Sequence, residues 1–110
     1  MANLFMCGGG KKITYETLSF TTETRHPSYN LVFDMTQIED YDKIVSIMVG
    51  NAYSKATVAI TGAETTELYY YGARVVEYVP GATTATLNMN VPRCSTQIPV
   101  TFDMLVVKEF

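Results

Sequence analysis

A run of three glycines and two lysines, Gly8-Gly9-Gly10-Lys11-Lys12, is the first segment with residue types suited to binding phosphate. A P-loop follows a strand, carries Ser or Thr directly after its lysine, and opens a helix. Here Lys11 is followed by Lys12, and the next residues alternate between apolar and polar as in a β-strand. We therefore predict no nucleotide or other cofactor, and we interpret residues 1–10 as a flexible N-terminal arm.

The densest group of acidic residues combines Asp34 with Glu39, Asp40 and Asp42. Calcium prefers several oxygen ligands, so such a group has the chemistry of a structural calcium site. The spacing, however, lacks the glycine and the distal glutamate of an EF-hand loop. We favour a solvated acidic turn and predict no metal site, with a structural calcium ion as the alternative.

Nucleophilic catalysis requires a base beside a serine or a cysteine. The one histidine, His26, precedes a proline in a polar segment, and the two cysteines, Cys7 and Cys94, are far from it in the sequence. This set does not form a zinc signature, and no spacing singles out two carboxylates for glycoside hydrolysis. We predict that the protein is not an enzyme and that both cysteines are free thiols, with a disulfide between them as the alternative.

The chain has eight tyrosines and no tryptophan. Tyrosine combines apolar area with a polar tip, so exposed tyrosines can stack on sugar rings or anchor a protein interface. On a strand, Tyr69 and Tyr71 lie on one face and Tyr70 on the other. We choose Tyr69 and Tyr71 as candidate binding residues, and we expect four others at the rim of the core: Tyr15, Tyr41, Tyr70 and Tyr78.

The composition limits the partners of this chain, whose 110 residues are enough for one small domain. Charged residues make up 17% of the chain, against about 25% in a typical soluble domain. The net charge is -3 and the lysines and arginines are scattered, so we predict no nucleic-acid binding. A surface with so few charges suits a protein that buries part of that surface against other copies or other proteins.

The N-terminal residues lack the basic start and the apolar stretch of a secretory signal peptide. No window approaches the roughly 18 consecutive apolar residues of a membrane-spanning helix. We therefore expect no signal peptide and no membrane partner, and synthesis in a cytosol.

The elements that would position these residues are strands. Threonine, valine and isoleucine together make up nearly a third of the chain, and β-branched residues pack well on a pleated surface. Short apolar runs separated by turn residues predict an all-β fold, a single antiparallel β-sandwich that is jelly-roll-like, over residues 11–110. The expected runs cover residues 11–22, 30–35, 43–49, 55–61, 67–79, 83–91 and 96–107.

Residues 36–51 fit more than one kind of structure. Thr36 and Glu39 form a capping box, which indicates the start of a helix. The following residues Ile44–Val49 are rich in β-branched types, which favours a strand. We favour a single helical turn, then a strand that ends in a turn at Gly50-Asn51, with a helix through Val49 as the alternative.

Two groups of apolar residues are candidates for contacts between subunits. Leu105 and Val107 lie on the face of the last run opposite to its core residues. Leu4, Phe5 and Met6 form apolar positions in the N-terminal arm, which would tether a neighbouring subunit. In the same last run, Pro99 lacks a backbone donor, so it should lie at an edge or a bulge.

Two stretches resemble a known group of proteins. One is Asp40-Tyr41-Asp42-Lys43-Ile44-Val45-Ser46-Ile47, followed by Ala56-Thr57-Val58-Ala59-Ile60. The other is the closing run Pro99-Val100-Thr101-Phe102-Asp103-Met104-Leu105-Val106-Val107. Together they are similar to short jelly-roll modules of phage tail and virion proteins and of related carbohydrate-binding domains. The resemblance covers about half the chain, and it implies a virion component that assembles as a homo-oligomer.

These observations lead to two hypotheses about function. The first is a structural virion subunit, such as a capsid decoration, head-fibre or tail-associated protein, made in a bacterial cytoplasm. It would act by self-association and by docking on a larger virion protein. The second is a carbohydrate-binding module that holds a glycan with Tyr69 and Tyr71. An inhibitor of a host defence protein is a third possibility, which no residue in the sequence tests.

Overall fold

The computed structural model describes residues 3–6, 12–24, 29–60, 63–90 and 98–110. This part of the chain consists of strands and two 3-10 turns: β1 (Asn3–Met6), β2 (Lys12–Thr24), β3 (Tyr29–Asp34), η1 (Met35–Gln37), η2 (Tyr41–Lys43), β4 (Ile44–Ile60), β5 (Ala63–Glu77), β6 (Thr84–Asn90) and β7 (Ile98–Glu109). The predicted all-β fold is confirmed. The alternative of a helix through Val49 is wrong, because β4 begins at Ile44.

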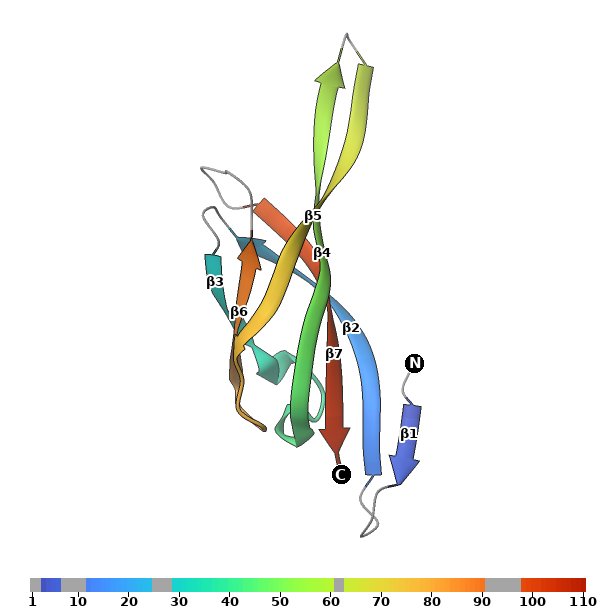
Figure 1. Cartoon of the computed structure of the whole chain (residues 1–110), viewed down its shortest axis with the longest axis vertical. Helices are drawn as coiled ribbons and strands as arrows, with labels where there is room; N and C mark the ends of the chain where they lie inside the picture. The colour runs from blue at the N-terminus through green and yellow to red at the C-terminus, as the bar shows by residue number, and fades with distance from the viewer. Residues whose placement is uncertain (1–2, 7–11, 25–28, 61–62, 91–97) are drawn as a thin grey trace.

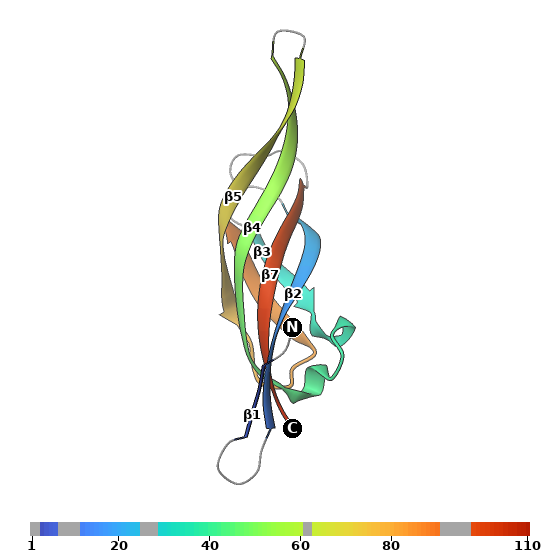
Figure 2. The ribbon, with the colours of Figure 1, turned by 90° about the vertical axis from the view of Figure 1, so that its right-hand side faces the viewer.

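The strands form one antiparallel sheet in the order β1-β2-β7-β4-β5-β6-β3 (Figure 1). Three of the pairs are nested in the sequence, since β4 pairs with β5, β3 pairs with β6, and β2 pairs with β7. Nested pairing of this kind is the pattern of a jelly roll. The sheet curls into a half-barrel, so that its two halves face each other as the layers of a sandwich do (Figure 2).

The core lies inside this curl and joins the two halves. Phe20 of β2, Phe33 of β3 and Phe102 of β7 form an aromatic cluster. The ring centroids of Phe20 and Phe33 are 4.9 Å apart, and those of Phe33 and Phe102 are 5.8 Å apart. Because aromatic rings favour such edge contacts, the cluster fixes how β2 and β3 approach each other without hydrogen bonds between them.

The two strands with the clearest alternation behave as expected. In β6 the positions Ala85, Leu87 and Met89 are buried, and the residues between them face outward. In β7 the inward set that runs from Val100 to Val106 is completely buried. The prediction for Pro99 is confirmed as well: the described pairing of β7 with β4 ends at Thr101, so Pro99 has a partner strand on one side only.

Strand β2 has no bulge, although its apolar pattern changes phase along the strand. Its pairing with β7 is continuous from Ile13 to Thr24, without a shift in register. The change in the apolar pattern arises because Tyr15 lies opposite Val107 on the outer face, while Glu16 points inward and pairs with Lys108. Both faces of β2 are therefore half-buried at this point.

The turn expected at Gly50-Asn51 is wrong. Strand β4 continues through these residues, and the register of β4 against β7 shifts between Gly50 and Tyr53. Asn51 takes a left-handed conformation with φ 51°, which asparagine tolerates better than most residues. A bulge uses the same residue types as a turn, so the two expected strands on either side of Gly50 are one long strand.

Strand β5 changes partner along its length. It pairs with β4 up to Tyr71 and with β6 from Gly72 onward. Past Tyr53, β4 pairs in the described part of the chain only with β5, and together they form a two-stranded ribbon that extends beyond the body of the sheet (Figure 1). The whole chain measures 63 × 25 × 19 Å. We call this segment, residues 54–60 and 63–69, the projecting hairpin.

The two 3-10 turns connect the end of β3 to the start of β4 and lie to one side of the sheet (Figure 2). Turn η1 is capped by Asp34 rather than by the expected capping box of Thr36 and Glu39. The Asp34 carboxylate accepts hydrogen bonds from the Thr36 backbone N–H at 2.9 Å and from its hydroxyl at 2.6 Å. Both bonds lower the pKa of the Asp34 carboxyl below its usual value, and the bond from the Thr36 hydroxyl has the larger effect.

The N-terminal segment, expected as a flexible arm, includes a strand. Asn3–Met6 form β1, which pairs with Lys12–Tyr15 at the edge of the sheet. The candidate tether residues Leu4, Phe5 and Met6 therefore lie on an edge strand of their own chain. The use of this segment as a tether to another subunit stays a prediction.

Candidate functional site

The outer face of β2, β7 and β4 is a surface on which candidate residues come together. Leu105 and Val107 both lie on this face and are half-buried. They alternate along β7 with buried residues that point inward. Thr17 and Met48 are the strand neighbours of Leu105, and Tyr15 is a neighbour of Val107. Because β7 is a central strand, these side chains form a continuous surface across three strands.

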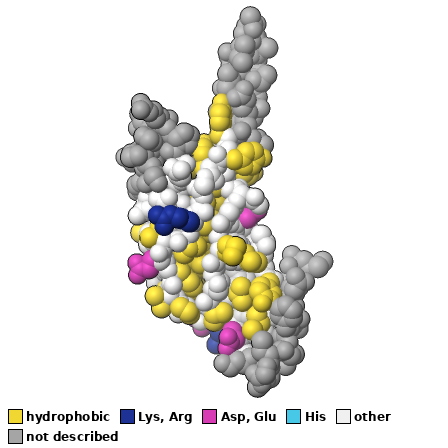
Figure 3. Space-filling model, viewed as in Figure 1, with side chains coloured by type: hydrophobic (Ala, Val, Ile, Leu, Met, Phe, Trp, Pro, Cys, Tyr) yellow, Lys and Arg dark blue, Asp and Glu magenta, His cyan; other side chains and the backbone are white. Residues whose placement is uncertain are grey.

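Apolar side chains are interspersed with polar ones on this surface, and Figure 3 shows them as separate patches. Met48 is 66% exposed, although it lies on a strand whose alternate side chains are in the core. A shallow hollow of about 190 Å³ lies around Gly50, and Met48, Leu105 and Asp103 are among its walls. A Cβ atom added to Gly50 would meet nothing within 4 Å, so the hollow is open to an incoming side chain.

Several polar side chains on this face form hydrogen bonds with one another. The Asn51 side-chain amide donates a hydrogen bond to the Asp103 carboxylate at 3.0 Å. The hydroxyl oxygens of Thr21 and Thr101 are hydrogen-bonded at 3.0 Å. Such bonds leave fewer polar groups to be satisfied when another surface covers the face.

Two tyrosines extend the same face toward the projecting hairpin. Tyr53 lies opposite Thr101 of β7 and Tyr70 of β5, and the two tyrosine rings are 5.9 Å apart. Tyr70 is 70% exposed. We define the outer stripe as the apolar and aromatic residues of this face: Tyr15, Met48, Tyr53, Tyr70, Leu105 and Val107.

The structure separates the two tyrosines chosen from the sequence. Tyr69 and Tyr71 do lie on the face opposite to Tyr70, as alternation predicts. Tyr69 is exposed, whereas Tyr71 packs against the core and its hydroxyl is hydrogen-bonded to the buried Ser54. Tyr71 therefore has a structural contact within its own chain.

The expectation that four tyrosines lie at the core rim holds for two of them. Tyr41 and Tyr78 pack against the core, and the Tyr78 hydroxyl donates to the Ile44 carbonyl at 2.9 Å. Burial raises the pKa of this phenol. For Tyr70 the expectation is wrong, because its position in β5 faces outward beside Tyr53 rather than into the core.

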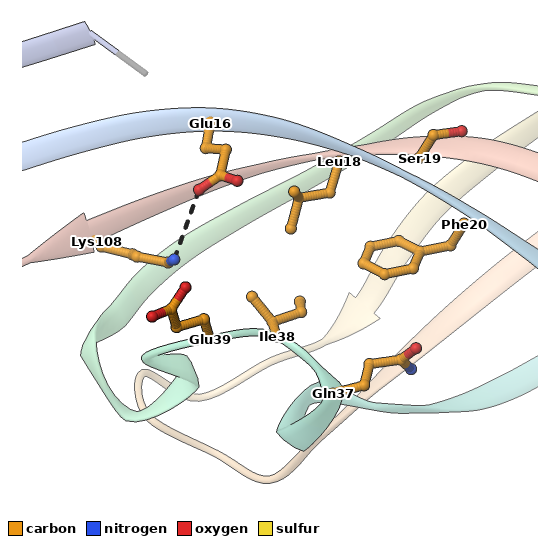
Figure 4. A pocket seen from close by; sticks show the side chains of 8 residues that line it. All are labelled: Glu16, Leu18, Ser19, Phe20, Gln37, Ile38, Glu39 and Lys108. Atoms are coloured by element: carbon orange, nitrogen blue, oxygen red, sulfur yellow. Dashed lines mark ion pairs between the residues drawn. The ribbon is translucent and has the colours of Figure 1, made fainter. Parts of the chain in front are cut away.

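A second candidate site is a pocket of about 250 Å³ on the inner side of β2, beside η1 (Figure 4). Its polar end contains Lys108, whose ammonium nitrogen lies 3.6 Å from Glu16 Oε2, together with Glu39. The Lys108 side chain is 8% exposed, and that of Glu16 is 37% exposed. Leu18, Phe20 and Ile38 line the apolar end. Since a buried ammonium needs a carboxylate nearby, Glu16 explains how Lys108 occupies an inward position.

A third depression, of about 410 Å³, lies on the outer face of β5 and β6. Gly72 and Ala73 are small residues in it, and Arg74, Asn88 and Asn90 contribute its polar groups. The Asn88 side-chain amide donates to the Asn30 side chain at 2.8 Å. We call this depression the amide hollow.

The other candidate residues are not brought together in the described part of the chain. Cys7, His26, Cys94 and the glycine run with Lys11 lie outside the described residues, as do the side chains of Leu4, Phe5 and Met6. Within the ranges described, no three acidic, histidine or cysteine side chains converge on a possible metal position. The acidic residues that follow β3 do not form such a group.

Sequence reasoning missed Met48, Tyr70 and Lys108 as surface or site residues. The helical interpretation of residues 36–51 placed Met48 on an apolar face, and the strand interpretation assigned it to neither face. In the strand register it shares its face with Ser46 and Gly50, which was the available signal. For Lys108 the signal was its place in an inward series: Phe102, Met104, Val106 and then Lys108.

We compared the chain with protein-family models, with curated proteins and with solved structures, and none of the three comparisons gave a match. Among the described residues, no helix has the length and apolar character needed to cross a bilayer.

Proposed function

We propose that this protein is a non-enzymatic structural subunit that associates with its own copies through the outer stripe and docks on a larger assembly, as small phage virion proteins do. The observation that carries the proposal is the exposure of the outer stripe. Tyr70 and Met48 are 70% and 66% exposed on the face of strands that are otherwise well packed. Apolar patches of this kind mark interaction surfaces.

Two further features support an assembly role. The chain has 17% charged residues, so little charge opposes association between copies. The projecting hairpin is two-stranded beyond the body, and an isolated hairpin is only marginally stable in water. A partner that packs against the hairpin would stabilise it.

The proposal predicts that Met48→Lys weakens self-association. A methionine side chain buried at an interface contributes about 1.5–3 kcal/mol, so the dissociation constant should rise roughly 10- to 100-fold. The measurement is the molar mass by light scattering over a dilution series. The matched control is Val32→Lys, because Val32 is 68% exposed on the outer face of β3, outside the outer stripe.

Either of two outcomes would overturn self-association through the outer stripe. One is a wild-type mass of a single 12.2 kDa chain at every concentration. The other is an equal loss of mass in both lysine variants.

A glycan-binding function is the second candidate, and the amide hollow favours it. Arginine and asparagine side chains donate and accept the hydrogen bonds that sugar hydroxyls make, and Tyr70 lies on the same face two residues before Gly72. This function predicts saturable binding on a glycan panel and a loss of at least about tenfold in affinity in Asn90→Ala. If Tyr69→Ala abolishes binding and Asn90→Ala does not, the binding site is on the opposite face.

A further inference from the structure

The outer edge of β2 is open over most of its length. Strand β1 pairs with β2 only from Lys12 to Tyr15. Lys12 exchanges both backbone hydrogen bonds with Phe110, so the even-numbered residues of β2 direct their backbone groups toward β7. The odd-numbered residues therefore direct theirs to the other edge.

Beyond Tyr15 this leaves four residues whose N–H and C=O groups face outward: Thr17, Ser19, Thr21 and Glu23. No described strand pairs with them, and all four residues are exposed. An open edge of this kind is a template for another strand.

The open edge has few of the features by which proteins usually block such pairing, and Glu23 at its end is the one charged residue among its four outward-facing positions. Those features are charges, prolines, glycine bulges and very short strands. The segment from Thr17 to Thr22 reads TLSFTT, with no charge, no proline and no glycine, and β2 shows no register shift there. Threonine and phenylalanine also favour extended structure. The edge is therefore suited to being covered in the assembled protein.

We infer that a second copy of this chain covers the edge, by antiparallel pairing of β2 with the partner's β2 around a two-fold axis at Phe20. This inference goes beyond the proposed function, because it uses the edge of the sheet and not the outer stripe. In this register Thr17 pairs with the partner's Glu23, and Ser19 pairs with the partner's Thr21. Each of these pairs exchanges two backbone hydrogen bonds, and the symmetry repeats them.

The length and the charges of the edge fit this register. Strand β1 begins at Asn3, opposite Tyr15, and the partner's β2 would end at Thr24, opposite Glu16. The two added strands thus lie end to end along β2. Glu23 faces a threonine of the partner, so no like charges are opposed. Phe20 meets the partner's Phe20 at the apolar end of the pocket that Leu18 and Ile38 also line.

Cysteine cross-linking tests this register directly. In hydrogen-bonded antiparallel pairs the Cα atoms are about 5.5 Å apart, within the range of a disulfide. In a background with Cys7→Ser and Cys94→Ser, the double variant Ser19→Cys with Thr21→Cys should form a covalent dimer under mild oxidation. Ser19→Cys alone and Thr21→Cys alone are the matched controls, and neither should cross-link.

The pattern of cross-links decides the inference. A covalent dimer of Thr21→Cys alone would indicate a two-fold axis at Thr21, and one of Ser19→Cys alone would indicate an axis at Ser19. Either result overturns the register. If none of the three variants cross-links, pairing of β2 with β2 is overturned.

A proline variant separates this edge from the outer stripe. Ser19→Pro removes an N–H that faces the open edge and no hydrogen bond to β7, so the fold should be kept. The mass measured by light scattering should fall by half relative to the parent protein. A dimer that survives Met48→Lys but not Ser19→Pro supports edge pairing and rejects the outer stripe. A dimer that survives Ser19→Pro overturns edge pairing and leaves the proposed function intact.

Discussion

Replacing Phe102 with alanine is expected to lower the free energy of unfolding by about 3–5 kcal/mol. The Phe102 side chain is completely buried, and its ring contacts those of Phe20 and Phe33 from the two facing halves of the sheet. The substitution would leave a cavity where the curl of the sheet is held together. Since small domains have about 5–15 kcal/mol of stability in total, the loss should be visible as a large shift in the urea midpoint.

The control for this prediction is Phe110→Ala. Phe110 is 49% exposed, and its backbone bonds to Lys12 do not involve the ring. A change of about 0.5 kcal/mol or less is expected there. Similar midpoints for the two variants would mean that the aromatic cluster does not hold the two halves together.

The second large effect concerns the charge at Lys108. Lys108→Glu should lower the free energy of unfolding by about 3–5 kcal/mol at neutral pH, because it removes one partner of a buried ion pair and adds a carboxylate beside Glu16 and Glu39. Lys108→Met also removes the ammonium, but it adds no second negative charge and its apolar side chain of similar length can fill the same space. Because Glu16 is 37% exposed and can stay hydrated, this variant should lose much less stability than Lys108→Glu.

Urea unfolding of both Lys108 variants at several pH values is the measurement. A carboxyl group introduced here would have a raised pKa in the folded state, because burial and like charges disfavour its charged form. The Lys108→Glu variant should therefore recover stability as pH falls through that pKa, and lose it as pH rises. A large loss in Lys108→Met would show instead that the ammonium is needed for the fold.

Much of the fold could be predicted from the sequence because the core strands alternate clearly. In β6 one face is apolar and the other polar, and in β7 the inward series from Val100 to Val106 is apolar throughout. These patterns need no knowledge of the partner strands. The turn at Gly50-Asn51 was mispredicted because glycine and asparagine accept left-handed backbone in bulges as well as in turns. Only the register of β4 against β7 distinguishes the two structures.

The candidate site was harder to predict, because exposure depends on pairing between distant strands. Leu105 and Val107 could be chosen from their phase within one run. Met48 and Tyr53 join them only because β4 lies beside β7, and Tyr70 joins them only because β5 pairs with β4. The buried Lys108 depends in the same way on Glu16 of β2, which is far away in the sequence.

The nested pairing of the strands also has a consequence for how the chain is made. Strand β7 lies between β2 and β4 in the sheet, yet it is synthesised after every other described strand. On the ribosome, β4 and β5 can form their hairpin early, because the loop that joins them is short. The pairs β3–β6 and β2–β7 close longer loops, and the second must wait for Ile98–Glu109 to emerge. Until then the nascent chain holds β2 and β4 without the strand that separates them, and the core around Phe102 closes only after β7 has emerged.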